Sequence, residues 1–409
     1  MTEQDNSVKN IRILLVDDEE NVLRGMARRI RSAQPTWSIK TAENGVAALE
    51  VMAGQTFDVI ITDLRMPVMD GSAFLAEASQ RSPDTIRLVL SGHADQDALL
   101  LAGRHSHQQF PKPTDVDFLI KEIHRLSRGQ TIIKDSLIRS RISIFGSKQL
   151  ITEVDEEVLR ALNDPDKYSI SEALQKAPQS MFRIIRTANS SFFGTATKID
   201  TIEGAVSLLG LDLVRVVILA QTHLKQDDHS APEKNQQFLA RLWEHSVRTA
   251  MLTRKIQNTL SIKVATGHII PSAAFHDIGK YILLDAYPTE YQEIMQSSLT
   301  QEVARPVWEI ERERFGNCHA EIGAQVLTLW GMPDEVARAV RLHHTPLLPD
   351  GSCEQAAMVL NIANALDHHA SWEAPYFPGY LDTQCLCHFG IEEDAVQTVV
   401  DELVTLTTV

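Results

Sequence analysis

The fold of the first part of the chain is decided by the stretch Val59-Ile60-Ile61-Thr62-Asp63-Leu64-Arg65-Met66-Pro67-Val68-Met69-Asp70-Gly71. Its first residues form an apolar run that is long enough for one buried parallel strand. The run delivers Asp63 at its carboxyl end, a Met-Pro turn ends the strand, and Asp70 can cap the helix that follows. Because ligands of open α/β sheets sit beyond the carboxyl ends of the strands, this pattern places Asp63 for chemistry.

Strands and helices alternate on both sides of this stretch. The expected strands cover residues 11–16, 38–42, 59–62, 87–90 and 108–110, and a last helix runs from residue 117. This alternation predicts an α/β fold with a doubly wound, parallel, five-stranded sheet over residues 10–128. The strand ends then bring together the side chains of Asp17, Asp18, Asp63, Ser91 and Lys112.

These five side chains suit phosphoryl chemistry. Three carboxylates in one crevice repel each other, and a hard divalent cation such as Mg²⁺ relieves the repulsion through oxygen ligands. Ser91 can donate a hydrogen bond to one phosphoryl oxygen, and Lys112 can neutralise another. The set favours attack by Asp63 on a phosphoryl donor to give an aspartyl phosphate.

The first domain closely resembles the receiver domain of two-component response regulators, which has a flavodoxin-like fold. The matching motifs are Val16-Asp17-Asp18, Asp63-x-x-Met66-Pro67-x-Met69-Asp70-Gly71, Ser91-Gly92 and Lys112-Pro113. The resemblance implies that Asp63 is the phosphoacceptor, that a sensor histidine kinase is the donor, and that Ser91 and Lys112 bind the phosphoryl group. It also implies a cis peptide bond at Lys112-Pro113.

The same resemblance implies a Mg²⁺ site, and the chain differs from the family at one position. The metal would be held by Asp17, Asp18, Asp63 and the main-chain carbonyl of Arg65. The family usually carries Tyr or Phe three residues before the lysine, where this chain has Gln109. Transmission of the phosphorylation signal is therefore expected to use a different side chain or a shifted strand.

Net charge, apolar runs and cysteine content argue against several classes of protein. A net charge of -15 argues against a protein that coats nucleic acid or sits permanently on a membrane surface. No apolar run approaches the roughly 20 residues that a membrane-spanning helix needs. The first ten residues are polar, unlike a signal peptide, and the few irregularly spaced cysteines suit a reducing compartment. We therefore expect a cytoplasmic protein with neither nucleic acid nor membrane among its partners.

From about residue 150 the pattern changes to helices only. This part strongly resembles the HDOD domain, an output domain related to HD phosphohydrolases, and the matching residues are Ala188-Asn189-Ser190 with Gly194, then Thr201-Ile202 to Leu209-Gly210. The resemblance implies an all-α, HD-superfamily-like domain over residues 150–350. A solvated linker over residues 129–149 is expected before it, and a helical extension over residues 351–409 is expected to pack on it. Asn189 and Ser190 are expected to cap a helix end.

Histidines gather in the second half of the chain. They are His245, His276 next to Asp277, His319, His343 and His344. Imidazole and carboxylate groups together suit Zn, Mn or Fe, and such a metal can activate water for attack on a phosphodiester. Resemblance to the HD superfamily implies metal binding by His245, His276 and Asp277. Resemblance to the HD-GYP cyclic-di-GMP phosphodiesterases implies additional metals at His319, His343 and His344.

Two departures argue against catalysis. The last aspartate of an HD site aligns with the neutral residue Asn364. Asp367 follows three residues later, and a rotation of about 300° along a helix is expected to point it elsewhere. After His343-His344 the chain continues as Thr345-Pro346-Leu347-Leu348-Pro349, whereas HD-GYP proteins have an acidic residue, then Asp-Gly and Gly-Tyr-Pro.

The sequence therefore predicts a two-component response regulator for phosphorelay signal transduction. Phosphorylation of Asp63 would control a non-catalytic HDOD domain that acts on a protein target or on its own copy. The alternatives are a metal-dependent phosphodiesterase of cyclic-di-GMP, or a degenerate relative that regulates an active one.

Overall fold

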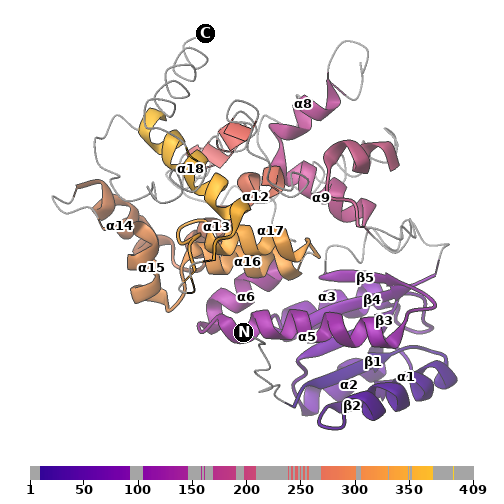
Figure 1. Cartoon of the computed structure of the whole chain (residues 1–409). Helices are drawn as coiled ribbons and strands as arrows, with labels where there is room; N and C mark the ends of the chain where they lie inside the picture. The colour runs from indigo at the N-terminus through magenta and orange to yellow at the C-terminus, as the bar shows by residue number, and fades with distance from the viewer. Residues whose placement is uncertain are drawn as a thin grey trace. The chain divides into compact units, whose positions relative to one another are not determined.

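The computed structural model describes residues 10–92, 105–145, 169–189, 198–208, 269–300, 305–329, 331–348 and 352–371, with single positions such as His245 between and beyond them. The chain divides into two compact units (Figure 1). The first consists chiefly of the residues up to Lys148, and the second contains nearly all of the rest.

The first unit is built on a parallel sheet with the strand order β2-β1-β3-β4-β5. The strands are β1 (Arg12–Val16), β2 (Ser38–Ala42), β3 (Val59–Asp63), β4 (Ile86–Ser91) and β5 (Gln108–Pro111). This confirms the predicted five-stranded, doubly wound α/β fold. Val16 pairs with Thr62 and Ser91 pairs with Pro111, so the strand ends that carry the predicted site meet at one edge.

In the described residues, the strands are connected by α1 (Glu20–Ala33), α2 (Gly45–Gly54) and α3 (Gly71–Arg81), and α5 (Val116–Ile132) follows the last strand (Figure 1). The side chain of Asp70 accepts a hydrogen bond from Ala73 N at 2.8 Å, so it caps α3 as predicted. Alternate strand residues on one sheet face, such as Leu14 and Ile60, pack with Phe74 and other α2 and α3 residues in one buried cluster. Ile13, Leu15 and Ile61 on the opposite face are buried as well, so burial of both faces explains why the central strands read as apolar runs.

Helix α6 (Ser136–Ile144) belongs to the first unit, and it is not the solvated linker that we expected over residues 129–149. Its Ile138 and Ile142 side chains are buried. The guanidinium of the fully buried Arg87 donates to the carbonyl of Ser143 at 3.1 Å, and His107 Nε2 lies 3.0 Å from Ser143 Oγ. The expectation failed because one face of the helix is buried, with Ile138 and Ile142 packed inside and Ser143 bonded to buried partners.

The second unit is helical, as predicted. Its labelled helices in the described residues include α8 (Ile170–Gln175), α9 (Pro178–Ala188), α12 (Ile269–Phe275), α13 (Ile278–Ala286), α14 (Pro288–Thr300), α15 (Val307–Phe315), α16 (His319–Leu329), α17 (Asp334–Leu342) and α18 (Gln355–Ser371). In the part of the chain that the structure describes, no helix is long and apolar enough to cross a membrane. Ser190, Gly194 and most of the extension after Ser371 lie outside the described residues.

Candidate functional site

The three carboxylates predicted at the strand ends lie together at the carboxyl edge of the sheet. Asp17 and Asp18 follow β1, Asp63 ends β3, and one oxygen of each lies within 4.8 Å of the others. Asp17 is buried, Asp63 is partly buried and Asp18 is exposed. The set therefore runs from the protein interior to solvent, and its oxygens suit a hard divalent cation.

Lys112 lies among these carboxylates. Its Nζ is 2.6 Å from Asp17 Oδ2 and 3.0 Å from Asp63 Oδ2. Burial alone would lower the pKa of Lys112, but Asp17 and Asp63 raise it above its ordinary value. Burial raises the pKa of Asp63, and Lys112 opposes part of that rise. The ammonium thus neutralises part of the carboxylate charge, and the Lys112–Pro113 peptide bond is cis as predicted.

Ser91 and Lys112 are held on neighbouring strands at the same edge. Ser91 is buried at the end of β4, and its carbonyl accepts a hydrogen bond from Lys112 N at 2.8 Å. Gln109, which stands where receiver domains usually have an aromatic residue, is partly buried. Phe110 is buried instead, and its ring meets Phe118 edge-on with the ring centroids 5.8 Å apart.

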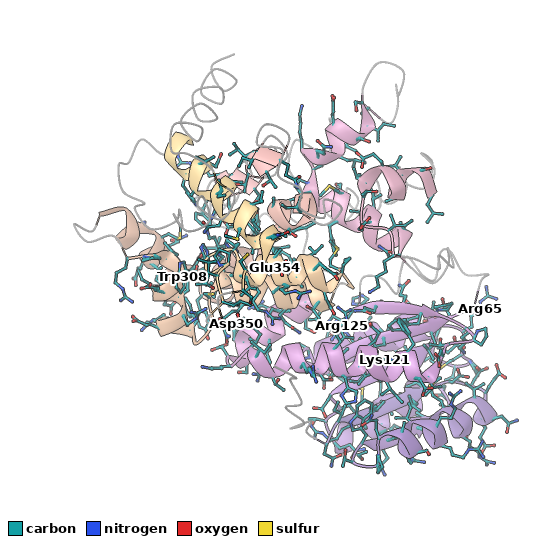
Figure 2. All side chains as sticks on the ribbon, viewed as in Figure 1. Arg65, Lys121, Arg125, Trp308, Asp350 and Glu354 are labelled. Atoms are coloured by element: carbon teal, nitrogen blue, oxygen red, sulfur yellow. The ribbon has the colours of Figure 1, made fainter. Side chains whose placement is uncertain are left out.

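The loop between β3 and α3 fixes the Asp63 carboxylate. Leu64 N donates a hydrogen bond to Asp63 Oδ1 at 2.8 Å. A Cβ on Gly71 would lie 2.0 Å from the Asp63 carbonyl oxygen, so glycine is required where α3 begins. Arg65, whose main-chain carbonyl is the predicted metal ligand, is exposed, and its side chain is labelled in Figure 2.

The same loop contains a strained turn at Val68. Its φ is 70°, and Met69 N donates to Pro67 O at 2.8 Å, so the three residues form a γ-turn. A β-branched residue with positive φ is unfavourable. The Val68 side chain is 86% exposed, so no packing of that side chain offsets the strain.

The second unit brings all six predicted ligands of the histidine centre together in its interior. His276 and Asp277 lie between α12 and α13, and His319 begins α16. A Cβ on Gly279 would lie 2.0 Å from the carbonyl oxygen of His319. Glycine at this position therefore lets α13 and α16 approach closely enough for Asp277 and His319 to meet. The remaining members are His245 and the pair that follows α17, His343 and His344.

One half of the centre consists of His245, His276 and Asp277. The Nε2 atoms of His245 and His276 lie 3.1 Å apart, and each lies 3.5 Å from Asp277 Oδ2. Lys280 Nζ donates to the same Asp277 oxygen at 2.7 Å. Burial would raise the pKa of Asp277, but His276, Lys280 and His319 hold it well below its ordinary value. Asp277 is therefore a carboxylate.

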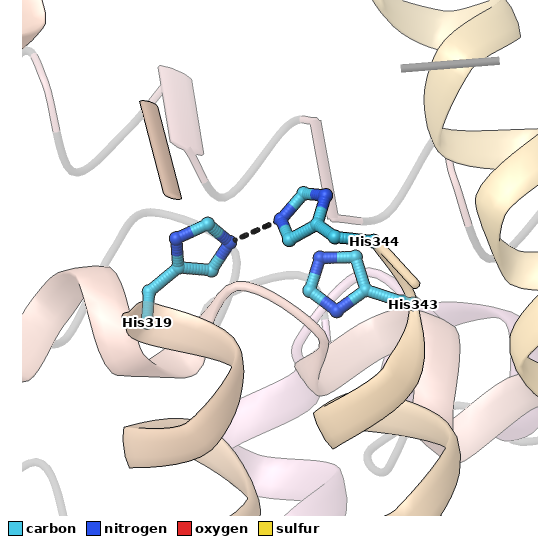
Figure 3. Close-up of side chains that lie close together, drawn as sticks. All are labelled: His319, His343 and His344. Atoms are coloured by element: carbon cyan, nitrogen blue, oxygen red, sulfur yellow. Dashed lines mark hydrogen bonds between the residues drawn. The ribbon is translucent and has the colours of Figure 1, made fainter. Parts of the chain in front are cut away.

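The other half consists of His319, His343 and His344 (Figure 3). His344 Nε2 lies 2.9 Å from His319 Nε2, and the His343 and His344 rings have centroids 3.8 Å apart. The second oxygen of Asp277, Oδ1, lies 3.2 Å from His319 Nε2. The two oxygens of Asp277 thus face the two halves of the centre.

The hydrogen bonds of His245 and His276 show which ring nitrogens carry protons. His245 Nδ1 lies 2.7 Å from Asp367 Oδ2, and His276 Nδ1 lies 2.7 Å from the carbonyl of Ala273. Both partners only accept, so both Nδ1 atoms donate. Burial lowers the pKa of His276 to about 4, so its ring is neutral near pH 7 and its Nε2 holds a lone pair. That lone pair faces His245 Nε2 at 3.1 Å, and a cation between the two nitrogens would be stabilised by it.

His343 and His319 also donate a hydrogen bond from Nδ1 to an acceptor outside the centre. His343 Nδ1 donates to the carbonyl of Val340 at 2.6 Å, and His319 Nδ1 donates to Glu311 Oε2 at 2.6 Å. Burial, then His276 and His319, hold the pKa of His343 well below its ordinary value. Among the described residues, its buried Nε2 has no hydrogen-bond partner. An outward Nδ1 proton and an inward Nε2 lone pair are the arrangement of metal-binding histidines.

Asp367 corrects our reading of α18. We expected it to point away from the centre, yet it is buried and bonds His245. A rotation of about 300° is the same as 60° in the opposite sense, so residues three apart share one helix face. Asn361 on the same face donates to the carbonyl of His343 at 2.8 Å. Asn364 lies between them, and within the described part its buried Oδ1 accepts no hydrogen bond.

These residues fit a metal centre. An ion with nitrogen ligands at roughly 2.0–2.1 Å keeps neighbouring ligand atoms roughly 3 Å apart, and the observed Nε2 separations are 3.1 and 2.9 Å. The donor set of imidazole nitrogens with a shared carboxylate suits Zn, Mn or Fe. Sequence reasoning missed the supporting residues Lys280, Glu311 and Tyr291, the last of which donates its hydroxyl hydrogen bond to Glu311 Oε1 at 2.8 Å. Of these three, only Lys280 could have been suspected from the sequence, because it follows His276-Asp277 by one helical turn.

Comparisons with known proteins find two domains. Residues 13–124 match the model of the response regulator receiver domain, and residues 149–346 match the model of the HDOD domain. The first match covers the parallel sheet with its carboxylates, and the second covers the helices that carry the histidine centre up to His344.

Individual relatives match parts of the chain. The DNA-binding transcriptional regulator NtrC of Escherichia coli is 32% identical over 181 residues, which are 44% of this chain and 33% of NtrC. DegU, a transcriptional regulatory protein of Brevibacillus brevis, is 29% identical over 38% of this chain and 66% of its own length. The crystal structure of the response regulator MmoQ from Methylococcus capsulatus is 23% identical, covers 60% of this chain and 96% of that chain, and has a TM-score of 0.46.

This chain thus spans about a third of the length of NtrC. The two domain matches together extend over most of its residues, and both units have the architecture that the matches require. The chain belongs to the response regulators that join an N-terminal receiver domain to an HDOD domain.

Proposed function

We propose that the receiver domain accepts a phosphoryl group on Asp63 from a sensor histidine kinase. The observation that carries this proposal is the position of Lys112, whose Nζ contacts both Asp17 and Asp63 at the sheet edge. An Asp63 oxygen attacks phosphorus, the bond between phosphorus and the kinase histidine breaks, and the product is an aspartyl phosphate. Ser91 and Lys112 hold the phosphoryl oxygens as negative charge moves onto them.

A divalent cation completes this site in the proposal. Asp17, Asp18, Asp63 and the Arg65 carbonyl would hold Mg²⁺, and their oxygen-rich geometry supports this assignment. When bound, Mg²⁺ supplies positive charge that lets phosphoryl oxygens approach the carboxylates. Lys112 offsets part of the same repulsion while the phosphoryl group is absent.

Phosphorylation of the full-length protein by acetyl phosphate tests the proposal. The wild-type protein is expected to gain an acyl phosphate that hydroxylamine removes, and Asp63→Asn is expected to gain none. Asp58→Asn is the matched control, because Asp58 precedes the same strand but pairs with Arg12 at an exposed position. If Asp63→Asn were phosphorylated as well as the wild type, the assignment would be wrong.

We further propose that the HDOD domain is a metal-binding signalling module that acts on a protein target or on its own copy. The supporting observation is that His245, His276 and His343 each direct Nδ1 to an outer acceptor and Nε2 toward the centre. Purified full-length protein is expected to contain a transition metal by elemental analysis, and His276→Ala is expected to lose it. Wild-type protein that stays metal-free after dialysis against Zn²⁺, Mn²⁺ or Fe²⁺ would refute the proposal.

Hydrolysis of a cyclic dinucleotide is the second candidate function of this domain. It is favoured by the carboxylate of Asp277, which faces both halves of the centre as a ligand shared by two metals would. It is disfavoured by the neutral Asn364 and by the loop after His344, which lacks the acidic residue and the Gly-Tyr-Pro of HD-GYP proteins. If the protein hydrolysed cyclic-di-GMP steadily and Asp277→Ala abolished this activity, the domain would be an enzyme and the non-catalytic proposal would be wrong.

A further inference from the structure

A buried carboxylate on α15 is directed at one half of the histidine centre. Glu311 is completely buried, and its Oε2 accepts hydrogen bonds from His319 Nδ1 at 2.6 Å and from His319 N at 2.8 Å. Its other oxygen, Oε1, accepts from the hydroxyl of Tyr291 at 2.8 Å. Three donors around one carboxyl group match an ionised carboxylate, which only accepts.

These contacts leave the His319 ring no freedom. The Nδ1 proton is committed to Glu311, and the main-chain N–H of the same residue anchors the same oxygen. Rotation of the ring would break a charge-assisted hydrogen bond in the protein interior, where such bonds are strong. The Nε2 atom therefore stays directed toward His344 Nε2 and Asp277 Oδ1.

Tyr291 holds Glu311 in place, and the helix of Glu311 reaches a second histidine through Trp308. Tyr291 is completely buried on α14, and α14 packs against α15. One turn before Glu311, Trp308 stacks on His344 with ring centroids 5.8 Å apart and an interplanar angle of 17° (Figure 2 labels Trp308). Trp308 and Glu311, three residues apart on one face of α15, thus contact two different histidines of the same half.

We propose that Glu311 is a positioning residue for the metal ligand His319, and that Tyr291 locks Glu311 in this role. A carboxylate that accepts the outer ring proton of a ligating histidine fixes its tautomer and raises the donor strength of the inner nitrogen. The proposal rests on the metal binding proposed above. It predicts that α15 makes the half with His319, His343 and His344 a stronger metal site than those three imidazoles alone.

Metal titration of the full-length protein gives the first test, with Zn²⁺ as the probe. Glu311→Ala is expected to weaken Zn²⁺ binding at the His319 half by roughly 10–100-fold. Glu311→Gln keeps an acceptor without the charge, so it should recover part of the loss. Glu313→Gln is the matched control on the same helix, because the Glu313 side chain is 67% exposed and pairs with Arg305. It should bind as the wild type does.

The tautomer of His319 gives a second readout that does not depend on metal. In metal-free protein labelled with ¹⁵N-histidine, at a pH where the His319 ring is neutral, His319 is expected to carry its proton on Nδ1. In Glu311→Ala the best remaining acceptor is Asp277 Oδ1, 3.2 Å from Nε2, so the proton should move to Nε2. Should Glu311→Ala fail to fold, Tyr291→Phe is expected to lower the affinity by a smaller factor and to populate the second tautomer.

The two readouts separate the two proposals. A wild-type protein that binds no metal, with the tautomer switch intact, would refute metal binding and leave Glu311 as the residue that orients His319. Unchanged affinity and an unchanged tautomer in Glu311→Ala, or in Tyr291→Phe if that is the folded variant, would overturn the role of Glu311.

Discussion

Replacement of Gly279 by alanine is the sharpest test of how the histidine centre is assembled. The new Cβ would lie 2.0 Å from the His319 carbonyl oxygen and 2.7 Å from its carbonyl carbon. A carbon and an oxygen in contact need roughly 3.3 Å, so α13 and α16 must separate by about 1 Å. Both atoms that clash belong to the backbone, so no rotamer change relieves the contact.

Two opposing contributions set the change in stability that Gly279→Ala causes. Alanine in place of glycine favours a helix by about 1 kcal/mol, while overpacking costs roughly 1–3 kcal/mol. Because here the clash is with backbone, we expect the upper end of that cost and a net destabilisation of about 2 kcal/mol. The separation also moves His319 away from Asp277, so Zn²⁺ affinity at that half of the centre should fall as well.

Hydrogen exchange on the full-length protein measures the effect locally. Amides of α13 and α16 in Gly279→Ala should exchange roughly 30-fold faster, which corresponds to about 2 kcal/mol. Gly25→Ala is the matched control, because Gly25 lies in α1 and no atom would lie within 4 Å of its new Cβ. That variant should be stabilised by roughly 1 kcal/mol. Unchanged exchange and unchanged Zn²⁺ affinity in Gly279→Ala would refute the close approach of α13 and α16.

Three further predictions concern single side chains. Val68→Gly should stabilise the receiver domain by about 1 kcal/mol in calorimetry of the full chain, since relief of the positive φ outweighs the entropy of glycine; a lowered midpoint would contradict the strained turn. Burial, then Glu321 and Glu311, raise the pKa of the Cys318 thiol to about 12, so at pH 8 only about one thiol in ten thousand is ionised. Iodoacetamide should therefore leave Cys318 unmodified in native protein, and rapid native alkylation seen by peptide mass spectrometry would refute this. Arg87→Met should speed exchange in α6, because Ser143 O loses its buried donor; wild-type protection there would show that the apolar contacts of α6 suffice.

The receiver domain could be predicted almost completely from its sequence. The three central strands β1, β3 and β4 are short, mainly apolar runs that lead into Asp17, Asp63 and Ser91, so the order of these strand ends is local information. Proximity then follows from the fold class, because parallel strands present their carboxyl ends at one edge. The pairing of Val16 with Thr62 places Asp17 beside Asp63 as expected. What the sequence did not reveal is α6, whose anchoring Arg87 looks like an ordinary strand residue.

The six side chains of the histidine centre were picked out from the sequence, and their role as metal ligands stays a prediction, whereas the residues that support them were missed. The six ligands stand out because histidine is rare and the His276-Asp277 pair is distinctive. Glu311 does not stand out, since Glu309 and Glu313 flank it on α15 with the same side chain. Glu311 is buried where it contacts Tyr291 on α14 and His319 on α16, while its two neighbours stay accessible to solvent. The residue type alone therefore cannot show which of the three glutamates is buried.

The charge of the assembled centre bears on the neutral residue at position 364. Asn364 removes one carboxylate from the expected metal site, which argued against metal binding. Yet Asp277, Glu311 and Asp367 are buried around the histidines, and in the described part of the centre Lys280 is the one ammonium that contacts them. Buried carboxylates in excess of buried cations are costly unless a positive charge joins them. Burial lowers the pKa of His276 and of His343. At His319 burial is outweighed by Glu311 and Asp277, which raise the pKa, so either a metal ion or a proton on His319 can supply this positive charge. The negative charge that such a site needs therefore survives the loss at position 364, because outer carboxylates deliver it through the imidazole rings that they bond.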